Sequence, residues 1–394
     1  MKNIFLNLQH GWNSLAIAIG MLLITEAVLY PFKHFHIFES QNEEPLSLLE
    51  GAPTPESYLE TNWYEGYVKE CLEAIPNISW KPYVYWSTHA YKGKYLNIDE
   101  RSIRKTWSPN RIGKTQKFKI FVFGGSTMWG WGARDDFTIP SIINKILFNE
   151  YGVDAEIINF GEVGYVSTQE LIRFMMEIQN NNIPDLVIFY DGLNEIFSAL
   201  RAGQVGQAGV SWGELDRKTA FHQEKLSVLQ RIATSYAAYS PVYYYISKIL
   251  RKNEPNETKN LDENQQQKIA TDIYQIYLQN LNIIRSISKF YGFKTLFYWQ
   301  PIILTKDDYT PYESHIASVG ESYFHGKSIF VQLRKLISNI KENDFHDLSE
   351  ILSGYQRPFY IDYFHIDELG NEILGRKIAN DVLEIVKKSN RSNL

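Results

Sequence analysis

Cysteine is almost missing from this sequence: among 394 residues, Cys71 stands alone. A single cysteine cannot close a disulfide within the chain, nor supply the paired thiolates of a Cys-type zinc site or a CxxC redox motif. An excess of basic charge is missing as well, because 40 Lys and Arg face 45 Asp and Glu. This balance argues against a nucleic-acid partner. The histidines form no HExxH arrangement, and the pair His34 and His36 lies beside an apolar segment, so we expect no metal and no cofactor.

Long apolar runs are also scarce, and the one that stands out covers residues 15–32, with Thr25 and Glu26 as its polar interruptions. Such a run is just long enough to span a bilayer as a helix. Trp12 and Tyr30 flank it, as aromatic residues often do at a membrane interface. The pattern favours one uncleaved transmembrane helix with the rest of the chain outside, in a bacterial periplasm or at the cell surface. A cleaved signal peptide and a buried helix remain alternatives.

Composition divides the chain into three parts. Residues 1–38 form the predicted membrane anchor, and residues 39–115 form a stalk followed by an aromatic-rich lead-in segment. Residues 116–394 carry alternating strand and helix signals, with 44% hydrophobic residues in the whole chain to build a core. This third part, residues 116–394, is the predicted α/β domain.

The alternation of strand and helix signals in residues 116–394 predicts an open parallel sheet with helices on both faces. Short apolar runs predict strands at 118–123, 155–160, 185–190 and 294–299, and a short fifth element at 359–361. Helices are expected at 139–150, 168–179 with Thr168 as cap, 269–290 and 367–387. The long helix is expected to bury an isoleucine face, made of Ile269, Ile273, Ile276, Ile283 and Ile287.

Polar residues and glycines follow the predicted strands in order, and the carboxyl ends of parallel strands are where ligands bind. Taken singly, each residue has an ordinary interpretation as a turn, a cap or a structural histidine. The turn after the strand predicted at 118–123 also does not match the GxSxG pattern, because Met128 stands at the position of the last glycine. Their joint occurrence makes them candidates for one site: Ser126, Gly164, Asn194, Asp362 and His365.

These blocks resemble the SGNH (GDSL-type) hydrolase superfamily, whose four sequence blocks supply Ser, Gly, Asn and His. The matching stretches are Gly-Gly-Ser-Thr, Asn-Phe-Gly-Glu-Val-Gly, Gly-Leu-Asn-Glu and Asp-Tyr-Phe-His, within residues 118–388. Two positions depart from the family pattern: Gly125 replaces the usual Asp before the serine, and Glu195 replaces the usual Asp after the asparagine. The resemblance implies a flavodoxin-like sheet of about five parallel strands.

The resemblance also implies a serine esterase. Ser126 would be the nucleophile, His365 the base and Asp362 the residue that orients the base. The backbone N–H groups of Ser126 and Gly164, with the Asn194 amide, would form the oxyanion hole. The expected substrate is an O-acyl ester, first of all an O-acetyl ester of an envelope or exported glycan.

Other functions stay open at this point. The same Ser-His-Asp site could serve an O-acetyltransferase, a lipase or a thioesterase, and an inactive glycan-binding or assembly module could keep the scaffold. The expected partners are an ester-bearing small molecule or glycan and, through the N-terminal helix, a membrane. The sequence indicates no oligomeric state.

Overall fold

The computed structural model describes residues 54–75, 78–110, 117–209, 261–323 and 326–392, together with residues 17, 20–26, 28, 240 and 242. The chain divides into two units, one formed by Met1–Gly51 and Ser211–Glu257 and the other by Ala52–Val210 and Thr258–Leu394. The second unit holds the sheet and every candidate site residue. It also takes in residues 52–115 of the predicted stalk and lead-in segment.

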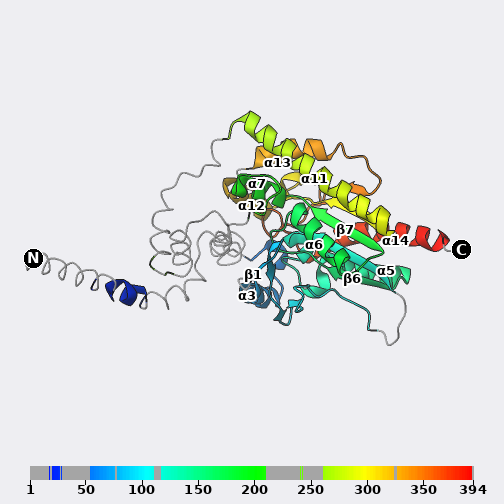
Figure 1. Cartoon of the computed structure of the whole chain (residues 1–394), viewed down its shortest axis with the longest axis horizontal. Coiled ribbons are helices and arrows are strands. Elements are labelled where there is room, and N and C mark those ends of the chain that lie inside the picture. Colours follow the sequence, from blue (N-terminus) through cyan, green and yellow to red (C-terminus); the bar gives the residue numbers. More distant parts are fainter. Residues whose placement is uncertain are drawn as a thin grey trace, which may run out of the picture. The chain divides into compact units, whose positions relative to one another are not determined.

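A parallel sheet of five strands forms the centre of the second unit (Figure 1). Its strand order, β6-β5-β7-β8-β9, is that of a flavodoxin-like fold. The strands are β5 (Phe118–Gly124), β6 (Ala155–Asn159), β7 (Leu186–Asp191), β8 (Lys294–Trp299) and β9 (Phe345–Asp347). All of β7 is buried, as expected for a central strand that is covered on both faces. The predicted α/β architecture is confirmed, and its first four strands start and end within about a residue of the prediction.

The fifth strand is not the one that the sequence predicted. β9 (Phe345–Asp347) pairs with β8, whereas residues 359–361 lie outside the sheet. There, Tyr360 forms an isolated antiparallel bridge with Ile366, which closes the loop between them. β9 is a short edge strand with the sequence Phe-His-Asp, which contains no apolar run that would indicate a strand. Residues 359–361 are apolar because they are buried in the core beside the sheet.

Helices cover both faces of this sheet (Figure 1). On one face α5 (Ile139–Tyr151) packs against α14 (Glu368–Ser392), and on the other α11 (Glu263–Tyr291) packs against α6 (Ser167–Gln179), α7 (Asn194–Ala202) and α13 (Lys327–Ile337). The other elements of this part are α4 (Ser126–Trp129), η3 (Asp135–Phe137), η5 (Ile303–Thr305) and α12 (Pro311–Tyr323).

Two helix details differ from the prediction. Thr168 is not the cap of α6, because the helix begins at Ser167, and the Gln169 side chain instead accepts a hydrogen bond from the Val166 N–H (3.3 Å). The buried face of α11 is rotated from the isoleucine stripe, so Ile283 is 44% exposed. Two of its buried residues, Asn280 and Ser288, are polar and are not marked by a hydrophobic pattern. The buried residues of α11 are Ala270, Ile273, Tyr277, Asn280, Leu281, Ile284 and Ser288.

The lead-in segment folds onto the sheet domain. Its elements are η2 (Glu56–Tyr58), α3 (Tyr64–Ala74), β1 (Ile78–Lys81), β2 (Tyr85–Thr88), β3 (Tyr91–Lys92) and β4 (Asn97–Ile98). The Trp86 indole N–H donates to the Val163 carbonyl (2.9 Å), and the Tyr165 hydroxyl donates to the Trp86 carbonyl (2.5 Å). These bonds fasten the lead-in segment to the loop that contains Gly164.

Half of the predicted membrane span, residues 15–32, lies outside the described residues. Within it, residues 20–26 are helical, with the side chains of Met21 and Ile24 exposed. Glu26 accepts hydrogen bonds from the Ser240 hydroxyl and from the Val242 N–H (3.4 Å). Across the residues that the structure describes, no helix combines the length and the apolar character needed to cross a bilayer.

Candidate active site

Three side chains from two distant parts of the sequence form a continuous chain of hydrogen bonds. His365 Nε2 lies 2.7 Å from Ser126 Oγ, and His365 Nδ1 lies 2.6 Å from Asp362 Oδ2. Ser126, Asp362 and His365 are 6%, 9% and 3% exposed. Hydroxyl, imidazole and carboxylate in this order can move the serine proton onto the imidazole while the carboxylate steadies the resulting charge.

One tight loop delivers both Asp362 and His365. Asp362 Oδ1 accepts the N–H groups of Phe364 (2.9 Å) and His365 (2.7 Å), and the Ile361 N–H donates to the His365 carbonyl (3.0 Å). Burial opposes ionisation of Asp362, but the adjacent imidazole and these donors outweigh it, so the pKa of this carboxyl lies below its usual value. Asp362 is therefore ionised, as an orienting partner for His365 must be.

Ser126 begins α4, directly after β5 ends. The preceding residue, Gly125, explains the first departure from the family pattern, because a Cβ built there would lie 2.3 Å from Asn194 Nδ2. The Asn194 side chain thus lies against the Gly125 backbone, where an aspartate could not fit without displacing it. This contact brings Asn194 to the side of the nucleophile.

The three predicted oxyanion donors belong to segments that converge beside Ser126. Asn194 Nδ2 donates one hydrogen bond to the Tyr165 carbonyl (2.8 Å), and its second N–H is left for another acceptor. Gly164 adopts φ 76°, a conformation that residues with a Cβ rarely adopt. Among the described residues, the backbone N–H groups of Ser126 and Gly164 donate to no protein acceptor. Each of the three donors therefore keeps an N–H group that no protein acceptor of the described residues engages.

Comparisons with known proteins were made at three levels. No protein-family model matches this chain, and no curated protein matches it. Several solved structures are similar to it in parts, including an acetyl xylan esterase, AlAXEase (16% identity, TM-score 0.33, covering 67% of this chain and 99% of that one).

Two further similar structures are a Clostridium thermocellum family 3 carbohydrate esterase (13% identity, TM-score 0.31, 69% of this chain and 98% of that one) and a protein described as a lipolytic member of the G-D-S-L family from Desulfitobacterium hafniense DCB-2 (10% identity, TM-score 0.32, 67% and 99%). At such low scores and identities, these similarities carry no argument about the function of this chain.

A cluster of buried carboxyl groups lies next to Asn194. Asp191 ends β7, Glu195 follows Asn194 in α7, and Glu170 comes from α6. Glu195 Oε1 accepts the Ser167 N–H (2.6 Å), which joins α7 to the start of α6. This bond explains the second departure from the family pattern, since the longer glutamate reaches across to Ser167.

The three carboxyl groups hold protons more tightly than free ones. Burial, and then the charge of Glu195, raises the pKa of Asp191 to about 8. Burial is also the main cause that raises the pKa of Glu170 and of Glu195, with the charge of Asp191 adding at Glu170. Interactions with the side chains of Glu170 and of Tyr277 in α11 partly offset the rise in the pKa of Asp191. The cluster is therefore partly protonated at neutral pH.

This cluster predicts that stability falls as pH rises. Above about pH 4 an unfolded aspartate has lost its proton, whereas folded Asp191 keeps its proton up to about pH 8, so the folded state binds more protons over this window. Asp191→Asn removes the titrating group and keeps a side chain that can hydrogen-bond. We expect the loss of unfolding free energy between about pH 5 and pH 8 to be smaller in this variant, measured by urea unfolding at several pH values. Parallel declines in both proteins would show that Asp191 does not titrate in this window.

Sequence reasoning missed residues that support the site from the lead-in segment. Thr88 of this segment donates two hydrogen bonds, from its N–H (2.9 Å) and its hydroxyl (2.5 Å), to the buried Glu162 in the loop that contains Gly164. Arg104 is fully buried and forms an ion pair with Asp135 (3.3 Å). The aromatic content pointed to packing in this segment, but no short motif linked these polar residues to Ser126.

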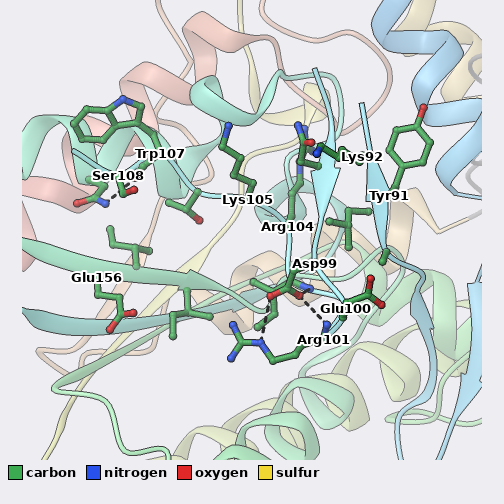
Figure 2. Close-up of a pocket in the computed structure, with 18 of the residues that line it drawn as sticks. Tyr91, Lys92, Asp99, Glu100, Arg101, Arg104, Lys105, Trp107, Ser108 and Glu156 are labelled. Carbon is green, nitrogen blue, oxygen red and sulfur yellow. Dashed lines mark hydrogen bonds and ion pairs between the residues drawn. The ribbon is translucent and has the colours of Figure 1, made fainter. Parts of the chain in front are cut away.

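One hollow of the second unit does not include any residue of the triad. It has a volume of about 780 Å³ and lies along β6, between this strand and residues 97–108. Figure 2 shows its lining, with Trp107 and Ser108 at one end, Tyr91 and Lys92 at the other, and Arg101 bonded to Asp99. In the described part of the chain, no group of three or more His, Cys, Asp or Glu side chains is arranged to hold a metal ion.

Proposed function

We propose that this protein is a serine esterase that cleaves O-acyl esters through an acyl-enzyme intermediate. The observation that carries the proposal is the Ser126–His365–Asp362 chain, with its two short hydrogen bonds at 2.7 and 2.6 Å. A serine hydroxyl is a weak nucleophile until a base takes its proton. His365 is in position to do so, and Asp362 fixes the tautomer whose Nε2 is free to accept.

In the acylation step, Ser126 Oγ attacks the ester carbonyl carbon as its proton moves to His365 Nε2. The carbonyl oxygen gains the negative charge, which the N–H groups of Ser126 and Gly164 and the Asn194 amide would stabilise. When the tetrahedral intermediate collapses, the bond to the alcohol oxygen breaks and His365 gives its proton to that oxygen. The products are an acyl-Ser126 ester and the free alcohol.

Deacylation repeats these steps with water. A water molecule attacks the acyl carbon, passes its proton to His365, and displaces Ser126 Oγ, which takes the proton back. An acceptor hydroxyl that replaced this water would turn the same site into an acyltransferase. The chemistry of the two reactions differs only in the second nucleophile.

As the substrate we propose an O-acetyl ester of an envelope or exported glycan. The support comes from the apolar run at residues 15–32, which we propose anchors the chain to a membrane with the catalytic unit on the outer side. Such a tether would keep the enzyme next to surface polysaccharides. The hydrogen bonds that Glu26 accepts from Ser240 and Val242 give this carboxyl polar partners, although it lies within an apolar run.

Acyl-chain profiling tests the proposed substrate class. We expect the full-length protein to cleave acetyl esters faster than octanoyl or longer esters and to release acetate from an O-acetylated polysaccharide. Faster turnover of long-chain esters would contradict the acetyl assignment and favour a lipase. Transfer of the acetyl group to an added oligosaccharide, at the expense of free acetate, would favour the acetyltransferase.

Asn194 provides a test of the oxyanion hole. Asn194→Ala removes one donor and is expected to lower kcat for acetyl ester hydrolysis by about 100- to 1,000-fold, because such donors act mainly on the charge that develops in the transition state. Asn282→Ala, on the exposed side of α11, is the matched control and should stay near the wild-type rate. Equal rates for the Asn194 variant and the wild type would remove Asn194 from the proposed hole.

A further inference from the structure

An indole ring covers the catalytic imidazole. Trp131 stacks on His365 with ring centroids 5.2 Å apart and an angle of 17° between the planes. Both side chains are buried, at 2% and 3% exposure. The two ring nitrogens of His365 are engaged by Ser126 and Asp362. The Phe364 ring lies 4.3 Å from the imidazole but is tilted by 55°, so the near-parallel stack is the one with Trp131.

The backbone around Trp131 is built to hold the ring there. Gly130 and Gly132, its two neighbours, have φ of 103° and 82°, where a Cβ is strongly disfavoured. A Cβ on Gly130 would lie 2.3 Å from Thr138, and one on Gly132 would lie 2.1 Å from Ile361. The Trp131 N–H donates to the Ser126 carbonyl (2.9 Å), which ties the stacking residue directly to the nucleophile.

Buried groups of the lead-in segment fix the same turn. The Arg104 guanidinium donates to the carbonyl groups of Gly130 (2.6 Å) and Ala133 (2.6 Å). The Tyr67 hydroxyl accepts the Gly132 N–H (2.8 Å), and the Tyr58 hydroxyl donates to the Gly132 carbonyl (2.7 Å). So many buried contacts on a turn of a few residues leave Trp131 little freedom to move away from His365.

We propose that Trp131 is a positioning residue that holds the His365 ring in line with Ser126 and stabilises the imidazolium formed during acyl transfer. This inference rests on the proposed function. When the Ser126 proton moves to Nε2, the imidazole becomes a cation, and the negative face of an indole attracts a cation placed over it. The stack therefore stabilises the protonated form of His365 more than the neutral form.

The test uses the rate at which a fluorophosphonate labels Ser126, measured across pH on the full-length protein. Trp131→Leu removes the aromatic face, and we expect labelling to slow by about tenfold. We also expect the acidic limb of the profile of labelling rate against pH to move to lower pH by roughly half a unit to one unit, because the imidazolium loses a stabilising contact. Trp131→Phe keeps a smaller aromatic face, so we expect its labelling rate and the position of its acidic limb to lie close to those of the wild type. Circular dichroism and the thermal midpoint show that each variant is folded.

Trp129→Leu is the matched control, because Trp129 is equally buried in the same turn but covers Arg104 at 4.4 Å instead of His365. Its acidic limb should stay at the wild-type position even if its rate changes. If Trp131→Leu does not fold, Trp131→Met, which fills more of the space, replaces it. An unmoved acidic limb in the folded Trp131 variants would overturn the inference. Failure of wild-type Ser126 to react at all would instead overturn the proposed function.

Discussion

Ser126→Ala is expected to lower kcat for ester hydrolysis by about 10,000- to 1,000,000-fold, the loss seen when the nucleophile of a serine triad is removed. Without the hydroxyl, no acyl-enzyme can form, and what remains is the stabilisation that the oxyanion donors give to attack by water. His365→Ala should cost a comparable factor, since an unactivated serine hydroxyl reacts slowly. Steady-state hydrolysis of an acetyl ester measures both variants.

The double variant makes this prediction sharper. Because Ser126 and His365 act as a unit across their 2.7 Å hydrogen bond, Ser126→Ala with His365→Ala should be about as slow as either single variant. Ser288→Ala, a serine of α11 bonded to the Arg285 carbonyl, is the control and should keep wild-type activity. A Ser126→Ala protein that retained more than about 1% of the wild-type rate would contradict the nucleophile assignment, since triad losses are far larger.

The second large effect concerns a buried ion pair beneath the catalytic loop. The Lys306 ammonium and the Glu313 carboxylate bond to each other with both side chains at 0% exposure. Lys306 Nζ also donates to the Arg357 carbonyl (2.6 Å), and Glu313 Oε1 accepts the Phe359 N–H (3.0 Å). The pair thus holds the segment that leads into Asp362 and His365.

Breaking this pair is expected to destabilise the protein strongly. Lys306→Met or Glu313→Gln alone leaves an uncompensated buried charge and should lower the unfolding free energy by about 3–5 kcal/mol. The double variant removes both charges, and its glutamine oxygen can still accept the Phe359 N–H. We therefore expect it to be more stable than Glu313→Gln alone, as measured by urea unfolding.

The exposed pair Lys268–Asp272 provides the comparison. Its lysine side chain is 75% exposed, so Lys268→Met should change stability by no more than about 0.5 kcal/mol. If the losses of Lys306→Met and Glu313→Gln simply added in the double variant, the two residues would not act as a coupled pair. If neither single variant lost stability, the segment before Asp362 would be held by other contacts.

Much of the catalytic arrangement follows from local sequence because of the geometry of parallel sheets. Strands β5, β6, β7 and β8 are short apolar runs, and a central strand covered on both faces has to look that way. Once these strands are placed, Ser126, Gly164 and Asn194 must lie at one edge. The same argument places Asp362 and His365 after a fifth strand at 359–361, which is not in the sheet, so for these two residues only the family resemblance is a sound guide.

Other features depend on contacts between residues far apart in the sequence. β9 is polar and short, and its pairing with β8 is set by the tertiary fold. The buried face of α11 includes Asn280, which donates to the Ser167 and Thr168 hydroxyls (3.0 and 3.1 Å), a role that hydrophobic periodicity does not reveal. Trp131 and Arg104 look like ordinary residues until the fold places one on His365 and the other under the turn beside it.

Covalent labelling of Ser126 tests the central claim most directly. The full-length protein is treated with a fluorophosphonate, digested, and analysed by mass spectrometry. Attack by Ser126 Oγ on phosphorus with loss of fluoride should leave an adduct on Ser126, and the folded His365→Ala variant should form it far more slowly. Folded wild-type protein that carries no adduct on Ser126, or that is labelled equally fast without His365, would contradict the serine esterase mechanism.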